Sequence, residues 1–444
     1  MFEREGKLYR QINESYAADY ERLTASGLYD ALVNRGWLIP HEECEEPGDG
    51  WRVIAPERIP YVSYPYEWCF SQLRDAALLT LDIQLLALDH GMTLKDASAF
   101  NVQFRGARPV FIDTLSFAQL DAEAPWIAYR QYCQHFLAPL ALMSYAEPRV
   151  RKLLLGFIDG VPLDLAARLL PLRSRLRYSM LAHIHLHARS QGQHADSQGA
   201  AGGRKMSLTL LKALIQSLRS ATQKCELPSR LNTEWGDYYS DTNYSIESMD
   251  DKEVLINTLV KKYAPADGTV HDLGANTGRF SRIAAQLQMQ VVSHDIDELA
   301  VERNYLAGRQ AQGVDHTHVL PLVLDLTNPT PALGWNASER DGFTDRCRGD
   351  VVMALALIHH LAISNNTPLG KVAEFLAPLS RTLIIEFVPK GDSQVDRLLA
   401  TREDIFPDYH EQGFEAAFAP YFDLKEKQPV GGTNRTMYAF ESRR

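Results

Sequence analysis

Five short apolar runs, separated by segments of helical pattern, constrain the fold of the second half of the chain more than any other feature. They begin near residues 270, 290, 320, 350 and 382. Runs that are apolar on both faces are typical of parallel strands covered by helices on each side. Ligands of such open sheets bind beyond the carboxyl ends of the strands. The sequence therefore predicts an α/β domain with a parallel sheet, whose ligand-binding edge carries Asp272, Asp295, Asp325, His359 and Glu386.

A glycine-containing turn follows the first run and narrows the kind of ligand. A dinucleotide fingerprint starting at Gly274 needs glycines where Asn276 and Arg279 stand, and a P-loop needs Lys-Ser/Thr after Gly278. What remains is the pattern acid-x-Gly-x-Asn-x-Gly, beginning at Asp272. This pattern resembles the first motif of class I S-adenosylmethionine (SAM) methyltransferases. The resemblance implies a Rossmann-like methyltransferase sheet with SAM as its cofactor.

The acids of the later runs fit the same interpretation. Asp295 stands 21 residues after Gly274, at the end of the second run, where a carboxylate can accept hydrogen bonds from ribose hydroxyls. The resemblance implies that Asp325 contacts the adenine amino group. Taken singly, each Asp is equally explained as a helix N-cap or turn residue. The expected cofactor-binding residues in this part of the chain are Asp272, Gly274, Asn276, Gly278, Asp295 and Asp325.

An aromatic and polar segment, residues 233–244, precedes the cofactor motif and contains Tyr239 and Tyr244. Rings of this kind could cover a bound sulfonium, because a cation facing an aromatic ring gains roughly 0.5–2 kcal/mol. We therefore expect both tyrosines to contribute to cofactor binding. The alternative is an ordinary aromatic cluster that packs the edge of the domain.

The methyl acceptor is indicated less directly. Amino-directed methyltransferases often carry Asn/Asp-Pro-Pro-Tyr/Phe after the fourth strand, whereas this chain has His359 and His360 there. Either imidazole could accept a proton from a hydroxyl, which slightly favours an oxygen acceptor. Alternatively, His359 caps the strand and His360 frames the pocket. We expect the catalytic residues among His359, His360 and Glu386.

The first half of the chain carries a second pattern, formed by Asp96, Asn101 and Asp113. It resembles the catalytic loop and metal-binding aspartate of protein-kinase-like phosphotransferases, in which Asn101 and Asp113 would hold magnesium for ATP. The departures are the absence of an N-terminal Gly-x-Gly-x-x-Gly, of a clear strand lysine, and of Phe after Asp113, where Thr114 stands. An active kinase, a kinase-like scaffold and an unrelated α+β domain all stay open.

Composition and a low-complexity segment set the domain plan. Residues 188–206 are rich in Gly, Ser and Gln and predict a flexible linker. Before the linker we expect an N-terminal α+β domain (1–187) that serves as a substrate platform, and after it the SAM-binding domain (207–444). The net charge of −10 argues against a nucleic-acid partner. The five cysteines form no C-x-x-C pair, and the start of the chain has no signal-peptide pattern. We expect a cytoplasmic bacterial enzyme with a small-molecule substrate, no resident metal and no membrane partner.

A looser resemblance concerns the acceptor. Tyr-Pro-Tyr-Glu-Trp at 64–68 and Ile-Glu-Phe-Val-Pro-Lys at 385–390 are similar to segments of bacterial nodulation-protein-like methyltransferases. That resemblance implies a small-molecule or saccharide-related acceptor. Two other functions stay open: a phosphotransferase, alone or as part of a bifunctional enzyme, and a noncatalytic SAM-binding protein.

Overall fold

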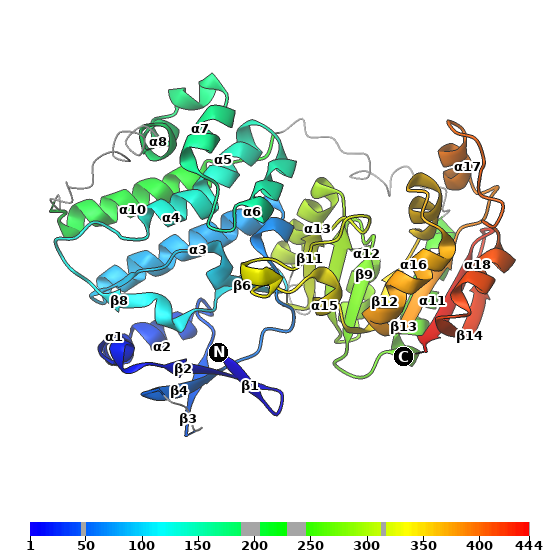
Figure 1. Cartoon of the computed structure of the whole chain (residues 1–444), viewed down its shortest axis with the longest axis horizontal. Helices are drawn as coiled ribbons and strands as arrows, with labels where there is room; N and C mark the ends of the chain where they lie inside the picture. Colours follow the sequence, from blue (N-terminus) through cyan, green and yellow to red (C-terminus); the bar gives the residue numbers. More distant parts are fainter. Residues whose placement is uncertain (46–49, 188–204, 229–245, 312–316, 444) are drawn as a thin grey trace. The chain divides into compact units, whose positions relative to one another are not determined.

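The computed structural model describes residues 1–45, 50–187, 205–228, 246–311 and 317–443. The chain forms two compact units (Figure 1). The first comprises Met1–Arg105 and Pro109–Leu231, and the second comprises Gly106–Arg108 and Asn232–Arg444. Among the described residues, no helix is both long enough and apolar enough to cross a bilayer.

The first unit begins with a small antiparallel sheet and continues into helices, which agrees with the expected α+β class. The sheet has the order β1-β2-β4-β3. Its strands and the two helices that follow β2 are β1 (Phe2–Arg4), β2 (Lys7–Ile12), α1 (Ala17–Ala25), α2 (Leu28–Val33), β3 (His41–Cys44) and β4 (Arg52–Pro56). After helix α3 (Phe70–Asp89) come two short strand pairs, β5-β8 and β6-β7. Their strands are β5 (Met92–Leu94), β6 (Val102–Arg105), β7 (Arg108–Phe111) and β8 (Phe117–Gln119).

A buried helix organises the rest of the first unit. Helix α3 (Phe70–Asp89) is apolar around most of its circumference, so it lies inside the helical layer. Helix α10 (Leu208–Gln223) packs against it, and Arg219 Nε donates to Asp82 at 2.6 Å. Because of these contacts α10 groups with the first unit, whereas the sequence placed it at the start of the second domain. Among the described residues of this unit, the other α-helices are α4 (Tyr129–Tyr132), α5 (Ala138–Tyr145), α6 (Leu153–Gly156), α7 (Leu163–Leu169) and α8 (Tyr178–Met180).

The second unit is built on a seven-stranded sheet with the order β11-β10-β9-β12-β13-β15-β14. The first five strands of that order are parallel to one another, and they are the five apolar runs of the sequence. Strand β15 is antiparallel to β13 and pairs with β14, a hairpin that the sequence did not predict. The strands are β9 (Thr269–Leu273), β10 (Gln290–Asp295), β11 (Val319–Val323), β12 (Gly349–Ala354), β13 (Ser380–Phe387), β14 (Phe422–Pro429) and β15 (Thr436–Ser442).

Helices cover both faces of this sheet. In β12, Val351 and Met353 join one apolar core, while Val352 and Ala354 join the other. The first core includes side chains of α11 (Ile246–Tyr263) and α12 (Arg279–Gln286), and the second includes side chains of α15 (Phe343–Arg346), α16 (Leu369–Leu376), α17 (Ser393–Leu399) and α18 (Glu411–Phe418). Helix α13 (Glu298–Gln310) contacts β10 and β11. This two-sided cover confirms the predicted α/β class with a Rossmann-like sheet.

Candidate cofactor-binding and active site

The turn after β9 needs glycine at two places. Gly274 and Gly278 both have φ of +78°, a left-handed conformation that side chains rarely adopt. A Cβ at Gly278 would lie 2.3 Å from Asn304 Oδ1, and one at Gly274 would lie 3.2 Å from Leu357 Cδ1. The Gly274 N–H donates to the His294 carbonyl at 2.8 Å, so the turn is fixed to β10. These contacts hold the backbone of the turn close to the carboxyl edge of the sheet.

Asp295 ends β10 and lies against this turn. Its carboxylate accepts from the backbone N–H of Asn276 at 2.7 Å and from that of Asp297 at 2.9 Å. Burial raises the pKa of Asp295 to about 6, although the backbone N–H donors oppose the rise. Asn276 itself has a φ of +51°, a conformation that asparagine tolerates better than most residues.

A cleft opens at the carboxyl edge of the sheet, where the strand order reverses between β9 and β12. Its volume of 330 Å³ lies within the roughly 300–1,000 Å³ typical of ligand pockets. Of the residues expected from the sequence, Gly274, Asn276, Asp295, Asp325 and His360 line it. Asp325 also accepts from the Thr327 N–H at 2.9 Å, so it closes a turn as well.

Asp272 and Gly278 are not among the residues that line the cleft. Asp272 is 1% exposed and accepts from Ser281 Oγ of α12 at 2.6 Å. Burial raises its pKa to about 6, and the Ser281 hydroxyl opposes that rise. Asp272 joins β9 to α12, and Gly278 allows the close approach of Asn304; their expected contact with the cofactor stays a prediction.

The two histidines differ in access. His360 lines the cleft, whereas His359 is 1% exposed and is not among its lining residues. Their ring centroids are 4.1 Å apart. Burial, aided by the positive charge of Arg435, lowers the pKa of His360 to about 4, so its imidazole is neutral at pH 7. His360 is thus the histidine that borders the cleft, and a catalytic role for either histidine stays a prediction.

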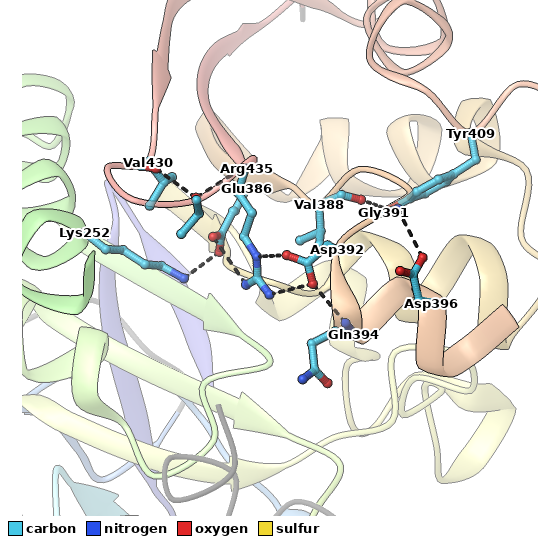
Figure 2. Close-up of polar contacts among 11 residues, drawn as sticks. Lys252, Glu386, Val388, Gly391, Asp392, Gln394, Asp396, Tyr409, Val430 and Arg435 are labelled. Carbon is cyan, nitrogen blue, oxygen red and sulfur yellow. Dashed lines mark hydrogen bonds and ion pairs between the residues drawn. The ribbon is translucent and has the colours of Figure 1, made fainter. Parts of the chain in front are cut away.

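Glu386, at the end of β13, belongs to a buried ion network (Figure 2). Lys252 Nζ of α11 lies 2.5 Å from Glu386 Oε2, and Arg435 Nη1 lies 3.7 Å from Oε1. Arg435 also donates to both oxygens of Asp392, at 2.8 and 3.1 Å. These cations compensate the Glu386 carboxylate inside the domain, which gives it a structural role; its expected catalytic role stays a prediction.

Sequence reasoning missed Lys252, Arg435 and Asp392 altogether. They come from three elements far apart in the chain, and no local spacing marks them as partners. Tyr239 and Tyr244, the other expected cofactor contacts, lie outside the described residues.

In the first unit, the Asp96 carboxylate accepts hydrogen bonds from its own turn and from α4. Its Oδ1 accepts from the Ser98 N–H at 2.8 Å and from Gln131 Nε2 at 2.9 Å. The carboxylate therefore joins its own turn to α4.

Asn101 and Asp113 do meet, at Ser116. The Ser116 hydroxyl donates to Asp113 Oδ2 at 2.6 Å, and Asn101 Nδ2 donates to the same hydroxyl at 3.2 Å. The Arg10 guanidinium pairs with Asp113 Oδ1. The kinase resemblance predicted that Asp113 would bind magnesium, but in the structure the Asp113 carboxylate pairs with the guanidinium of Arg10. Within the described part of the chain, no group of three or more His, Cys, Asp or Glu residues is arranged to hold a metal ion.

The doubly wound sheet and the cleft at its switch point define the second unit as a Rossmann-like α/β domain. Comparison with known proteins places the whole chain more narrowly. It is 34% identical over 436 residues to nodulation protein NoeA of Rhizobium meliloti (strain 1021), covering 96% of this chain and 90% of the relative. The chain belongs to the family of that nodulation protein. No protein-family model matches the sequence.

Three solved structures that resemble the chain each cover less than half of it. The PH0226 protein of Pyrococcus horikoshii OT3 is 17% identical (47% of this chain, 99% of that one, TM-score 0.32). The N-methyltransferase NodS of Bradyrhizobium japonicum WM9, in complex with S-adenosylhomocysteine, is 10% identical (48% and 94%, TM-score 0.34). The magnesium protoporphyrin IX methyltransferase ChlM of Synechocystis PCC 6803, with bound S-adenosylhomocysteine, is 18% identical (47% and 92%, TM-score 0.32).

Proposed function

We propose that the second unit binds SAM and transfers its methyl group to a small-molecule or saccharide-related acceptor. The observation that carries the proposal is the cleft at the switch point, which brings the Asp295 carboxylate, the Gly274 turn and the neutral His360 imidazole to one cavity. The relative is named for nodulation, and we propose that the methylated product serves the same process.

The residues present fit a nucleoside cofactor. Asp295 uses backbone N–H donors to fix its position, and a carboxylate has about four acceptor sites, so capacity is left for ribose hydroxyls. Ile296 and Leu326 line the cleft beside it and offer apolar sides to an adenine ring. Gly274 lines the same cleft and has no side chain to keep a ligand from its backbone. These groups would hold the adenosyl part of SAM.

The bound cofactor would supply an electrophilic methyl group on a sulfonium. The chain must then align the acceptor and receive its proton. His360 is suited to the second task, because its imidazole is neutral at pH 7 and borders the cleft. Ser364 and Asn365 line the same cavity and could orient a polar acceptor. Asn365 Nδ2 donates to the His360 carbonyl at 2.9 Å, which ties the two residues together.

Calorimetric titration with SAM, S-adenosylhomocysteine and ATP–magnesium tests the binding step. We expect the first two to bind the wild type, Asp295→Ala to abolish that binding, and Asp423→Ala to leave it unchanged. Asp423 is the control because it is an exposed aspartate paired with Arg443 on the surface of the same unit. Binding of ATP alone, or SAM binding that survives Asp295→Ala, would contradict the proposal.

Turnover needs a separate measurement, since a noncatalytic protein would also bind SAM. Methyl-labelled SAM is incubated with the protein and a fractionated bacterial extract, and label in new small molecules is counted. We expect His360→Ala to lose label transfer and to keep SAM binding. Retained binding with no transfer by the wild type would favour a noncatalytic SAM-binding protein.

A further inference from the structure

Exposed apolar side chains gather on one part of the first unit. Five of the fifteen exposed large apolar residues among those described fall between residues 169 and 186. Leu172, Leu176 and Tyr178 are 75%, 87% and 80% exposed, and Leu169 and Leu186 are about half exposed. Single exposed apolar residues need no explanation, but a concentrated patch marks an interaction site. We call residues 168–186 the apolar–basic surface; it runs from the end of α7 past α8 (Figure 1).

The same surface is strongly basic in an acidic chain. Arg168, Arg173, Arg175 and Arg177 belong to it, and residues 165–187 contain no Asp or Glu, although the net charge of the chain is −10. All four arginines are exposed. Arg168 lies 3.5 Å from Asp164, and its side chain is still 80% exposed. A local positive field therefore surrounds the apolar side chains.

A groove of 640 Å³ is hollowed into this surface. Its walls come from the end of α7, the 3-10 turn Leu172–Leu176 and the π-helical turn Leu181–Leu186. Leu169, Leu170 and Leu172 give it an apolar lining, and its charged lining residues are Arg168, Arg175 and Asp164, so cations outnumber the one acid. Apolar walls beside guanidinium groups match an amphiphile with an anionic head group.

We propose that the apolar–basic surface docks the protein peripherally on an anionic lipid bilayer. Leu172, Leu176 and Tyr178 would enter the interfacial layer, and the arginines would pair with lipid phosphates. A second copy of this chain fits less well, because four guanidinium groups would face four others. This proposal departs from the sequence-based expectation of no membrane partner.

Co-sedimentation of the full-length protein with vesicles tests the proposal. Vesicles of phosphatidylcholine alone are compared with vesicles containing about 30 mol% phosphatidylglycerol, a level that gives an anionic surface. We expect binding to the anionic vesicles only, weakening as salt rises from about 0.1 to about 0.5 M. Arg168→Gln/Arg175→Gln should weaken the apparent affinity by about fivefold for each charge removed.

Leu172→Ser/Leu176→Ser tests the apolar contribution, and Ile127→Ser/Leu210→Ser is its matched control. The control residues are 75% and 61% exposed and belong to the first unit outside this surface, so both variants should fold. We expect the first variant to lose vesicle binding and the control to keep it. Absence of wild-type binding, or equal binding by both variants, overturns the proposal. It is also overturned if the surface instead forms a dimer that dissociates in Leu172→Ser/Leu176→Ser, measured by sedimentation velocity, or if it binds only an acidic protein.

Discussion

Replacing Lys252 by Met should strongly destabilise the second unit. Lys252 and Glu386 are 2% and 0% exposed, so the substitution leaves a buried carboxylate that has lost its nearest cation. Burial lowers the pKa of Lys252, while its attraction to Glu386 raises it. The attraction between the two charges thus offsets the free-energy cost of removing both from water. Removing one partner keeps the desolvation of the other.

The distances set the magnitude. At an effective dielectric constant of about 20, charges 2.5 Å apart attract by about 7 kcal/mol, and charges 3.7 Å apart by about 4.5 kcal/mol. Arg435 supplies only the weaker attraction to Glu386 and is already engaged by Asp392. Breaking a buried pair on one side costs about 3–5 kcal/mol, and we expect a loss in this range.

Hydrogen exchange measured by mass spectrometry is the suitable assay, because it reports opening free energies for peptides of α11 and β13 separately from the first unit. The control is Lys252→Met/Glu386→Leu, which removes both charges and should recover most of the loss. A loss below about 1 kcal/mol in Lys252→Met, or a double variant whose loss equals the sum of the two single losses, would refute the reasoning.

Three further predictions concern the cleft and its turn. Burial raises the pKa of Asp295 to about 6, so the carboxylate gains a proton as pH falls through that value. SAM affinity, measured by calorimetry, should therefore drop about tenfold from about pH 7.5 to about pH 5. Asp295→Asn should remove this pH dependence. Gly278→Ala should destabilise the second unit by about 1–3 kcal/mol in a thermal melt, because its φ is +78° and a Cβ would meet Asn304; an unchanged melting temperature would contradict the geometry. His360→Gln should reduce label transfer far more than SAM binding, whereas equal losses in both would indicate a role in holding the cofactor.

The parallel part of the fold was predictable because its signal is local. Each central strand is buried on both faces, as Val351 and Val352 in β12 illustrate, so each appears as an unbroken apolar run. Strand β14 is different: five of its eight residues are polar or charged, and most of the strand is exposed, so no apolar run marks it. Helix α10 follows a Gly-rich segment, and its tertiary contacts, chiefly those with α3, place it in the first unit.

The candidate site was predictable to the level of the edge of the sheet. The end of a parallel strand fixes where a residue lies, and Asp295 and His360 accordingly line the cleft. Which way a side chain turns depends on partners from distant segments. Asp272 turns to Ser281, and Glu386 turns to Lys252 and Arg435.

Acids at strand ends therefore have different roles according to the donors that reach them. Asp113 and Glu386 each meet a guanidinium or ammonium group of the protein, so their charge is already compensated by a covalently attached cation. Asp295 is held by the neutral backbone N–H groups of Asn276 and Asp297, and it borders an open cavity. A carboxylate of that kind is fixed in position and still able to accept hydrogen bonds from a ligand. This difference, more than the presence of an acid at a strand end, explains why the proposed cofactor site centres on Asp295.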